Sequence, residues 1–447
     1  MSETSRAFAT AQVQAGYVPS AAENTAIPPI HQSNAFEFSS LTQARELFAL
    51  KRDGNIYSRA ANPTVIVFER RVAELEGGIA AAGVASGQAA VAVALLALAK
   101  SGEHIVAARQ LYGGTVDLLQ DTFADWGIEV TFVDQDDLDA WRAAVRPNTR
   151  ALFAESITNP IAQVLDVQAV ADIAHAARVP LVIDNTVATP YLQRAKDVGA
   201  DIVVHSATKF LGGHGTSLGG VVVDLGTYDF GAEPDRWPQL NEPYARVHGE
   251  SLVERFGATG SPYITLVKTK YVHDLGPSLS AFNAFQLLQG IETLDLRMAR
   301  HTQSAHAIAE FLSEHPAVAH VHHPALAGSP WHDLAERYLP RGAGSVFSFD
   351  LHSSGDDEED FARVEEFISH LEVVHLVANI GDARSLAAHP ASMTHSHMSA
   401  DQLGEARIGW TTVRLSIGLE DPADIIADLD RALRAVPVAV RDSVAAG

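Results

Sequence analysis

The sequence predicts an α/β fold built on a mostly parallel sheet that helices cover. Short apolar strand patterns alternate with helix-length patterns from residue 104 to residue 206, as in a run of βαβ units. Two β-branched runs, IVV at 202–204 and VVV at 221–223, have the composition of buried strands. The 447 residues are 47% hydrophobic, which is enough for more than one core.

The N-terminal residues 1–63 are predicted to form an extended arm. The stretch AENTAIPPIHQSNAF contains prolines and polar residues and shows little regular periodicity. An arm that cannot bury its own side chains needs another surface, so we expect it to contact the neighbouring subunit. The arm ends near Tyr57 and Arg59, a phenol and a guanidinium suited to gripping a phosphate.

Two helices follow the arm. Between Thr64 and Gly77 the pattern VIVFERRVAELEGG predicts an amphipathic helix that a glycine ends. The next run, VASGQAAVAVALLALAKSG, is apolar on all sides, which predicts a buried helix with Ser86, Gly87 and Gln88 at its N-terminus. Free N–H groups at this end are able to bind an anion, and an ordinary serine cap is the alternative.

The alternating region brings several polar residues to one edge of the predicted sheet. Strands are expected at 104–108, 129–134, 151–156, 181–185 and 202–206, with helices near 115–126, 137–144 and 167–177. In such sheets ligands bind beyond the carboxyl ends of the strands. Asn159, Asp184, Ser206 and Lys209 fall at or just after such ends, so we expect them to share one site.

Lys209 lies in a glycine-rich loop between two buried strands. This is an unusual place for a strongly hydrated cation unless it does chemistry, although a solvated loop lysine is the general alternative. Ser206 and Thr208 offer hydroxyls to a phosphate, and the Asp184 carboxylate needs a cationic partner such as a protonated pyridine nitrogen. Together these residues suggest a Schiff-base lysine and pyridoxal 5′-phosphate (PLP) as the cofactor.

Less regular segments occupy the middle of the chain. Tyr112, in the LYGGT loop after a strand, is suited to stacking on a planar ring, with a surface turn as the alternative. Residues 226–257 lack periodicity and are predicted to be a loop insertion that carries function or covers a site. A long helical stretch from about 277 to 314 leads into the C-terminal region.

That region is predicted to be a smaller α/β domain with strands at 345–351 and 413–421. Asp421 and Pro422 provide a capping residue and a first-turn proline for a last helix. The acidic run at 355–361 is expected to be a loop and a helix start rather than a binding site. We place the domains at 1–63, 64–290 and 291–447.

Composition excludes several classes of protein. The chain has no cysteine, which excludes disulfides and thiolate chemistry of its own, and its formal charge of −23 argues against nucleic-acid or anionic-membrane partners. No stretch is apolar enough to span a membrane, and the first residues lack a secretory pattern, so we expect a cytoplasmic protein. The GGHGTSLGG run lacks the residue order of a nucleotide-binding loop, and the histidine pairs lack metal-ligand spacing, so no metal is expected.

Taken together, the motifs resemble the Cys/Met-metabolism PLP enzymes. YSRAANPT, SGQAA, LYGGT, ESITNP, VIDNTVATP, HSATKFLGGHG, SLAAHPASMTH and VRLSIGLED occur in the order of that family. The resemblance covers nearly the whole chain and implies a fold-type I PLP-dependent transferase. Within the family the chain is most similar to the O-acetylhomoserine sulfhydrylases, because of the EPYARVHG insertion, RGAGSVFSF and DARSLAAHPASMTH.

The resemblance also implies residue roles. Lys209 would carry the cofactor and act as acid and base, Asp184 would pair with the pyridine nitrogen, and Tyr112 would stack on the ring. Asn159 would bind near the cofactor's phenolic oxygen and the substrate, while Ser385 and Arg414 would take the substrate carboxylate. The implied phosphate ligands are Ser86, Gly87, Gln88, Ser206 and Thr208, with Tyr57 and Arg59 from the neighbouring subunit.

The implied reaction is γ-replacement of O-acetyl-L-homoserine with sulfide or methanethiol, giving homocysteine or methionine and acetate, by a homo-oligomer expected to be a tetramer. Cystathionine or methionine γ-lyase, cystathionine γ-synthase and O-succinylhomoserine sulfhydrylase remain alternatives on the same scaffold. Arg384 favours the first reading, since related lyases and cystathionine synthases usually carry glutamate there. An arginine would concentrate hydrosulfide, unless it simply pairs with Asp382.

Overall fold

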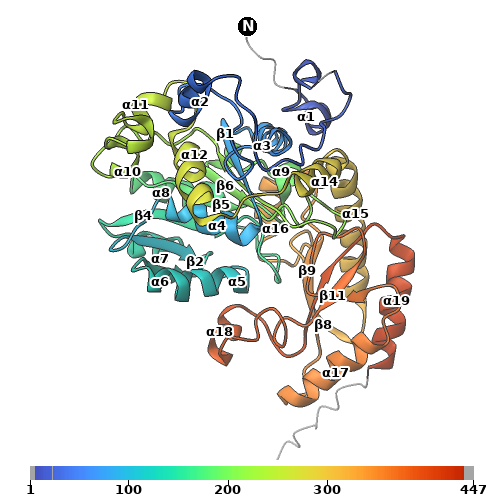
Figure 1. Cartoon of the computed structure of the whole chain (residues 1–447). Helices are drawn as coiled ribbons and strands as arrows, with labels where there is room; N and C mark the ends of the chain where they lie inside the picture. Colours follow the sequence, from blue (N-terminus) through green and yellow to red (C-terminus); the bar gives the residue numbers. More distant parts are fainter. Residues whose placement is uncertain (1–5, 23, 437–447) are drawn as a thin grey trace, which may run out of the picture. The chain divides into compact units, whose positions relative to one another are not determined.

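The computed structural model describes residues 6–22 and 24–436, which divide into two compact units. The larger unit takes in the chain up to Arg109 together with 114–156 and 166–295, and the smaller unit takes in 110–113, 157–165 and the chain from Leu296 onwards. Two loops that interrupt the sequence of the larger unit therefore belong to the smaller one. Each unit is built on its own sheet (Figure 1).

The sheet of the larger unit has seven strands in the order β1-β7-β6-β5-β4-β2-β3. Their bounds are β1 Ala80–Val84, β2 His104–Ala108, β3 Glu129–Val133, β4 Thr149–Glu155, β5 Leu181–Asp184, β6 Ile202–His205 and β7 Gly220–Asp224. All neighbours are parallel except β7, which runs antiparallel to both β1 and β6. The predicted α/β fold with a mostly parallel sheet is confirmed. The carboxyl ends of β4, β5 and β6 lie at one edge because these strands are parallel.

The helices of the alternating region lie close to where the sequence places them. Apolar patterns at 3.6-residue spacing become α3 Pro63–Glu76, α4 Gly87–Leu96, α7 Leu138–Ala144 and α8 Val167–Ala176. Helix α3 ends at Gly77, whose left-handed φ of 73° suits a residue without a side chain. The helix expected near 115–126 is broken instead into α5 Gly113–Asp117, a wider turn η2 Leu118–Thr122 and α6 Phe123–Asp125.

Other segments differ more from the expectation. The N-terminal arm is not extended throughout, because it contains α1 Phe8–Gln14, η1 Pro19–Ala21 and α2 Leu41–Phe48. The 226–257 insertion contains short helices whose three to five residues are too few to show periodicity. The remaining short elements of this unit are α9 Thr189–Leu192, η3 Ala195–Val198, α10 Pro238–Asn241, η4 Ala245–Val247, α11 Leu252–Phe256, α12 Pro262–Leu266, η5 Val267–Val272 and α13 His273–Leu275.

The smaller unit is an α/β unit around a five-stranded, mostly antiparallel sheet in the order β10-β11-β12-β9-β8. Its strands are β8 Val318–His322, β9 Val346–Leu351, β10 His375–Leu376, β11 Leu386–Ala388 and β12 Thr412–Ser416. The long helical stretch is two helices: α14 Ala281–Ile291 belongs to the larger unit, and α15 Leu294–Glu314 lies almost entirely in the smaller one. The other helices are α16 His332–Tyr338, α17 Asp357–Ser369, α18 Ala400–Glu405 and α19 Pro422–Ala435, which Asp421 caps as predicted.

Candidate active site

The ends of β5 and β6 are joined by a threonine that links two predicted cofactor residues. Asp184 is the last residue of β5, and its Oδ1 accepts a hydrogen bond from the Thr186 N–H at 3.0 Å. The Thr186 hydroxyl in turn accepts the Ser206 N–H at 2.8 Å. Burial raises the pKa of Asp184, and hydrogen bonds from Thr186 together with the charge of His205 oppose that rise.

A close backbone approach brings the N-terminus of α4 to Ser206. A side chain at Gly87 would place its Cβ 2.4 Å from the Cβ of Ser206, and one at Gly220 would lie 2.0 Å from the Ser86 carbonyl oxygen. Glycine is therefore required at both positions. The Ser86 hydroxyl accepts the Ala89 N–H at 3.1 Å, so Ser86 is the ordinary cap that the sequence allowed as an alternative.

The loop that carries Lys209 is held by its own backbone. The Lys209 N–H donates to the Ser206 carbonyl at 3.1 Å, and its carbonyl accepts the Gly213 N–H at 2.7 Å. The Thr208 hydroxyl donates to the Gly219 carbonyl at 3.2 Å and accepts the Gly219 N–H at 3.0 Å. Thr208 thus closes the loop, while Ser206 and Lys209 lie half-buried on it.

These residues fit a phosphate-bearing pyridine cofactor. The glycine at position 87 leaves Ser206 against the first turn of α4, whose free N–H groups and dipole attract a phosphate. The Gln88 side chain is committed elsewhere, since its Nε2 donates to the Gly114 carbonyl at 2.5 Å. Asp184 offers a half-buried carboxylate at the next strand end, where a protonated ring nitrogen would compensate its charge.

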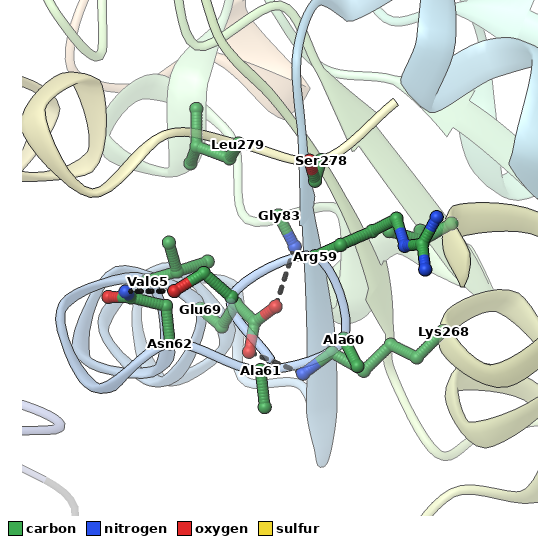
Figure 2. A pocket seen from close by; sticks show the side chains of 12 residues that line it. Arg59, Ala60, Ala61, Asn62, Val65, Glu69, Gly83, Lys268, Ser278 and Leu279 are labelled. Atoms are coloured by element: carbon green, nitrogen blue, oxygen red, sulfur yellow. Dashed lines mark hydrogen bonds and ion pairs between the residues drawn. The ribbon is translucent and has the colours of Figure 1, made fainter. Parts of the chain in front are cut away.

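Tyr57 and Arg59 border a different part of the larger unit. The Arg59 guanidinium lies 5.6 Å from the centre of the Tyr57 ring, and both side chains are exposed. Figure 2 shows Arg59 at a small hollow that is also lined by Glu69, which is bonded to Lys268 and to the Gly83 N–H. None of the residues predicted to bind the phosphate or the ring from the same chain lines this hollow.

In the smaller unit, Arg414 is a buried cation. Its Nη2 donates to the Asn379 carbonyl at 2.8 Å, and its Nε has no hydrogen-bond partner among the described residues. Burial lowers the pKa of Arg414 to about 10, and the phenol of Tyr112 opposes this shift. A buried guanidinium whose hydrogen bonds within the described chain go to carbonyl oxygens is suited to binding a carboxylate. Tyr112 and Arg414 are therefore close enough to interact, and Tyr112 is 46% exposed.

Ser385 is held by a carboxylate that the sequence interpretation did not single out. Its N–H donates to Glu420 Oε1 at 2.7 Å, and its hydroxyl donates to Glu420 Oε2 at 2.8 Å. The hydroxyl also accepts the Gly418 N–H at 2.9 Å. Both hydrogen-bonding functions of the hydroxyl are thus in use. Glu420 is the penultimate residue of the VRLSIGLED motif, and its place in that motif is the signal that could have identified it.

The remaining predicted residues lie on loops of the smaller unit. Asn159 is buried and precedes Pro160 through a cis peptide. The Ser348 hydroxyl of β9 donates to the Pro160 carbonyl at 2.8 Å, which anchors the loop. Arg384 Nη1 lies 2.9 Å from Asp382 Oδ1, the pairing that the sequence left open as an alternative.

Comparison with known proteins identifies the family. The family described as Cys/Met metabolism PLP-dependent enzyme matches residues 9–434. The chain belongs to this family. It is 43% identical over 432 residues to an O-acetyl-L-homoserine sulfhydrylase of Leptospira meyeri, covering 95% of this chain and 96% of the relative. It is 45% identical over 436 residues to one of Corynebacterium glutamicum, covering 96% and 97%.

A solved structure from Campylobacter jejuni, assigned as an O-acetylhomoserine (thiol)-lyase, superposes with a TM-score of 0.90 at 37% identity. It covers 96% of this chain and all (100%) of the other, and it contains a lysine carrying pyridoxyl phosphate. The protein is accordingly a fold-type I, PLP-dependent enzyme, as predicted. Across residues 6–22 and 24–436, helices with the length and apolar character needed to cross a bilayer are lacking.

Proposed function

We propose that the protein is an O-acetylhomoserine sulfhydrylase that joins sulfide or methanethiol to the γ-carbon of O-acetyl-L-homoserine. The observation that carries this is the 43–45% identity, along almost the whole chain, to two proteins described by that activity. The products are homocysteine or methionine and acetate. The γ-carbon loses its bond to the acetate oxygen and gains one to sulfur. The proton of the thiol leaves with the acetate or passes to solvent, so the reaction is balanced.

PLP, when bound, supplies an electron sink for removal of the protons next to the substrate amine. Lys209 would hold the cofactor, and its Nζ would move those protons. Asp184 keeps the ring nitrogen protonated. Ser206 and the N–H groups of Gly87 and Gln88 bind the phosphate, with Ser86 capping the helix that presents them.

Residues of the smaller unit recognise the substrate in this proposal. Arg414 binds the substrate carboxylate, since its buried charge lacks an anionic hydrogen-bond partner among the described residues. Glu420 accepts hydrogen bonds from the Ser385 N–H and hydroxyl, which fixes the start of β11. This strand pairs with β12, the strand that carries Arg414. Tyr112 stacks on the cofactor ring, and Asn159 holds its phenolic oxygen. Thr208 keeps the lysine loop closed.

We also propose that the enzyme is a homo-oligomer, a cytoplasmic tetramer, whose N-terminal arm (1–63) reaches the neighbouring subunit, with domains at 64–290 and 291–447. The described part of the arm exposes a concentration of large apolar side chains: Val13, Val18, Ile27, Ile30, Leu41, Phe48 and Tyr57. Such a concentration on one short segment is typical of an interface. Arg59, which lines the hollow in Figure 2, and the nearby Tyr57 would reach the phosphate of the cofactor in the partner subunit.

A comparison of initial rates with different substrates tests the proposed activity. The purified holoenzyme is supplied with sulfide and O-acetylhomoserine, O-succinylhomoserine or, without sulfide, cystathionine, and initial rates are compared. The proposal expects the acetyl ester to give the largest kcat/KM. Faster cleavage of cystathionine would replace it with the lyase assignment.

Chemical trapping tests the assigned lysine separately. Borohydride reduction of the holoenzyme followed by peptide mapping should place the pyridoxyl group on Lys209. Lys209→Ala should keep the fold, seen by circular dichroism, and lose turnover. An adduct on another lysine would reject the assignment whatever the substrate proves to be.

A further inference from the structure

Glu76 and His205 form a buried pair behind the predicted cofactor-binding edge. His205 Nε2 lies 2.7 Å from Glu76 Oε1, and neither side chain has any exposed surface (0% each). Glu76 is the last residue of α3, and His205 is the last residue of β6, directly before Ser206. The pair therefore joins a helix to the strand end that carries a predicted phosphate ligand.

The hydrogen bonds of Glu76 identify which nitrogen of His205 carries the proton. Its carboxylate accepts the Asn185 Nδ2–H at 2.9 Å and the Ala195 N–H at 3.4 Å, besides the histidine. A carboxylate only accepts, so Nε2 of His205 carries the shared proton. His205 Nδ1 is buried and has no hydrogen-bond partner among the described residues. The imidazole is thus an ionisable hydrogen-bond partner of the buried Glu76 carboxylate.

The same pair is linked to Asp184 in two ways, through hydrogen bonds of the neighbouring Asn185 and through the electrostatic effect of His205. Asn185, which Glu76 holds, follows Asp184 directly and also accepts the Ser156 hydroxyl at 2.8 Å. The Asn185 N–H donates to the Val204 carbonyl at 3.0 Å, so the ends of β5 and β6 are tied together. Electrostatically, the His205 charge opposes the effect of burial on Asp184. Two carboxylates, Glu76 and Asp184, thus share the field of one imidazole.

We infer that Glu76 and His205 are positioning residues that act on the cofactor through Asp184: Glu76 fixes the His205 imidazole at the end of β6, and this buried pair sets the electrostatic environment in which Asp184 meets the ring nitrogen. This inference rests on the role of Asp184 in the proposed function. Neither residue reaches substrate or cofactor in this scheme. A buried pair of this kind is costly to break from one side, because the remaining charge is left without compensation.

Three variants test the pair: His205→Gln, Glu76→Gln and the double substitution. His205→Gln replaces the imidazole with a neutral group and leaves the Glu76 carboxylate near Asp184, so the PLP dissociation constant should rise about tenfold or more, which corresponds to about 1.4 kcal/mol. Glu76→Gln removes the carboxylate but leaves His205 a neutral hydrogen-bond acceptor, so it should weaken PLP binding less. The double variant should bind PLP more tightly than His205→Gln alone, because no unpaired carboxylate remains.

Glu74→Gln is the matched control, since Glu74 is on the same helix with a side chain 40% exposed, and it should leave PLP binding unchanged. The second readout is the visible absorbance spectrum of the bound cofactor. This spectrum should differ from the wild type in His205→Gln. In the double variant it should come closer to the spectrum of Glu76→Gln. A His205→Gln protein with wild-type PLP affinity and spectrum but a lower Tm would overturn the inference, leaving the pair a packing device. If His205→Gln fails to fold, unchanged affinity and spectrum in Glu76→Gln and the double variant overturn it equally. Because cofactor binding is measured, none of these outcomes depends on which ester the enzyme turns over.

Discussion

Arg384 and Asp382 form an ion pair with Nη1 and Oδ1 2.9 Å apart, and the arginine side chain is 63% exposed. The Arg384 N–H also donates to the same carboxylate oxygen at 3.1 Å. The positive charge is therefore largely offset by its neighbour. An exposed pair of this kind contributes little, because solvent screens both charges.

Arg384→Glu should consequently lower kcat/KM for sulfide by no more than about fivefold, the range expected for an exposed charge pair. The loss should be larger for sulfide than for methanethiol at neutral pH, because only hydrosulfide is substantially anionic. Rates with both thiols at low and high salt measure it. A loss that is equal for the two thiols would mean that Arg384 does not act through its charge.

Gly87→Ala should abolish or strongly weaken PLP binding, because the new Cβ would lie 2.4 Å from the Cβ of Ser206. Separating the helix from the strand end displaces the N–H groups proposed to hold the phosphate. Equilibrium dialysis of PLP measures the effect. Gly328→Ala is the control, since a side chain there meets nothing within 4 Å, and it should bind PLP normally.

Arg414→Lys should raise KM for O-acetylhomoserine by about ten- to a hundredfold while PLP binding changes little, since a charge-assisted hydrogen bond contributes about 1.5–3 kcal/mol. Lysine keeps the charge but loses the planar fork that binds a carboxylate at two points. Steady-state kinetics at saturating sulfide tests this. Arg434→Lys, on an exposed face of α19, should leave KM unaltered.

Subunit exchange tests the proposed role of the arm. Arg59→Ala and Lys209→Ala proteins should each be inactive or nearly so, but a mixture should recover part of the activity, because some hybrid sites hold both native residues. Activity after mixing, with exchange verified by mass-tagged subunits, is the measurement. No recovery despite exchange would place both residues in the same chain's site.

His175 should make stability depend on pH. Its Nε2 lies 2.8 Å from Asp201 Oδ2, and this hydrogen bond raises the pKa of His175 above the ordinary 6.5. The contribution to stability is therefore present in full below pH 6.5 and is lost as the pH rises through the folded-state pKa. The Tm difference between wild type and His175→Gln should shrink over that rise. A constant difference would contradict the linkage.

Much of the larger unit could be predicted because its strands are short β-branched runs with a local signal. HIVAA at 104–108 and IVV at 202–204 are strands in the structure. The strand β1, AAAGV, was not predicted, because alanine has little β-propensity and the strand is defined by pairing with β7 far along the chain. Tertiary pairing of this kind leaves no local pattern.

In the candidate site, the residues proposed to contact the cofactor could be predicted from the sequence. The residues that hold them in place through hydrogen bonds could not. Asp184, Ser206 and Lys209 stand at strand ends that the sequence marks. Glu76 looks like one more polar residue of an amphipathic helix, and only the fold shows that it points at His205. The Ser385–Glu420 bonds likewise join residues 35 positions apart, which periodicity cannot connect.

The pairing of β1 with β7 also bears on how the chain is made. At about 5–20 residues per second during synthesis, β1 leaves the ribosome several seconds before β7 exists, and β7 is the neighbour that β1 bonds in the sheet. Gly87 likewise cannot pack against Ser206 until residue 206 has been made. The β1 segment must therefore remain unpaired while the rest of the sheet is synthesised. Its alanines and glycine make the unpaired segment a poor template for aggregation.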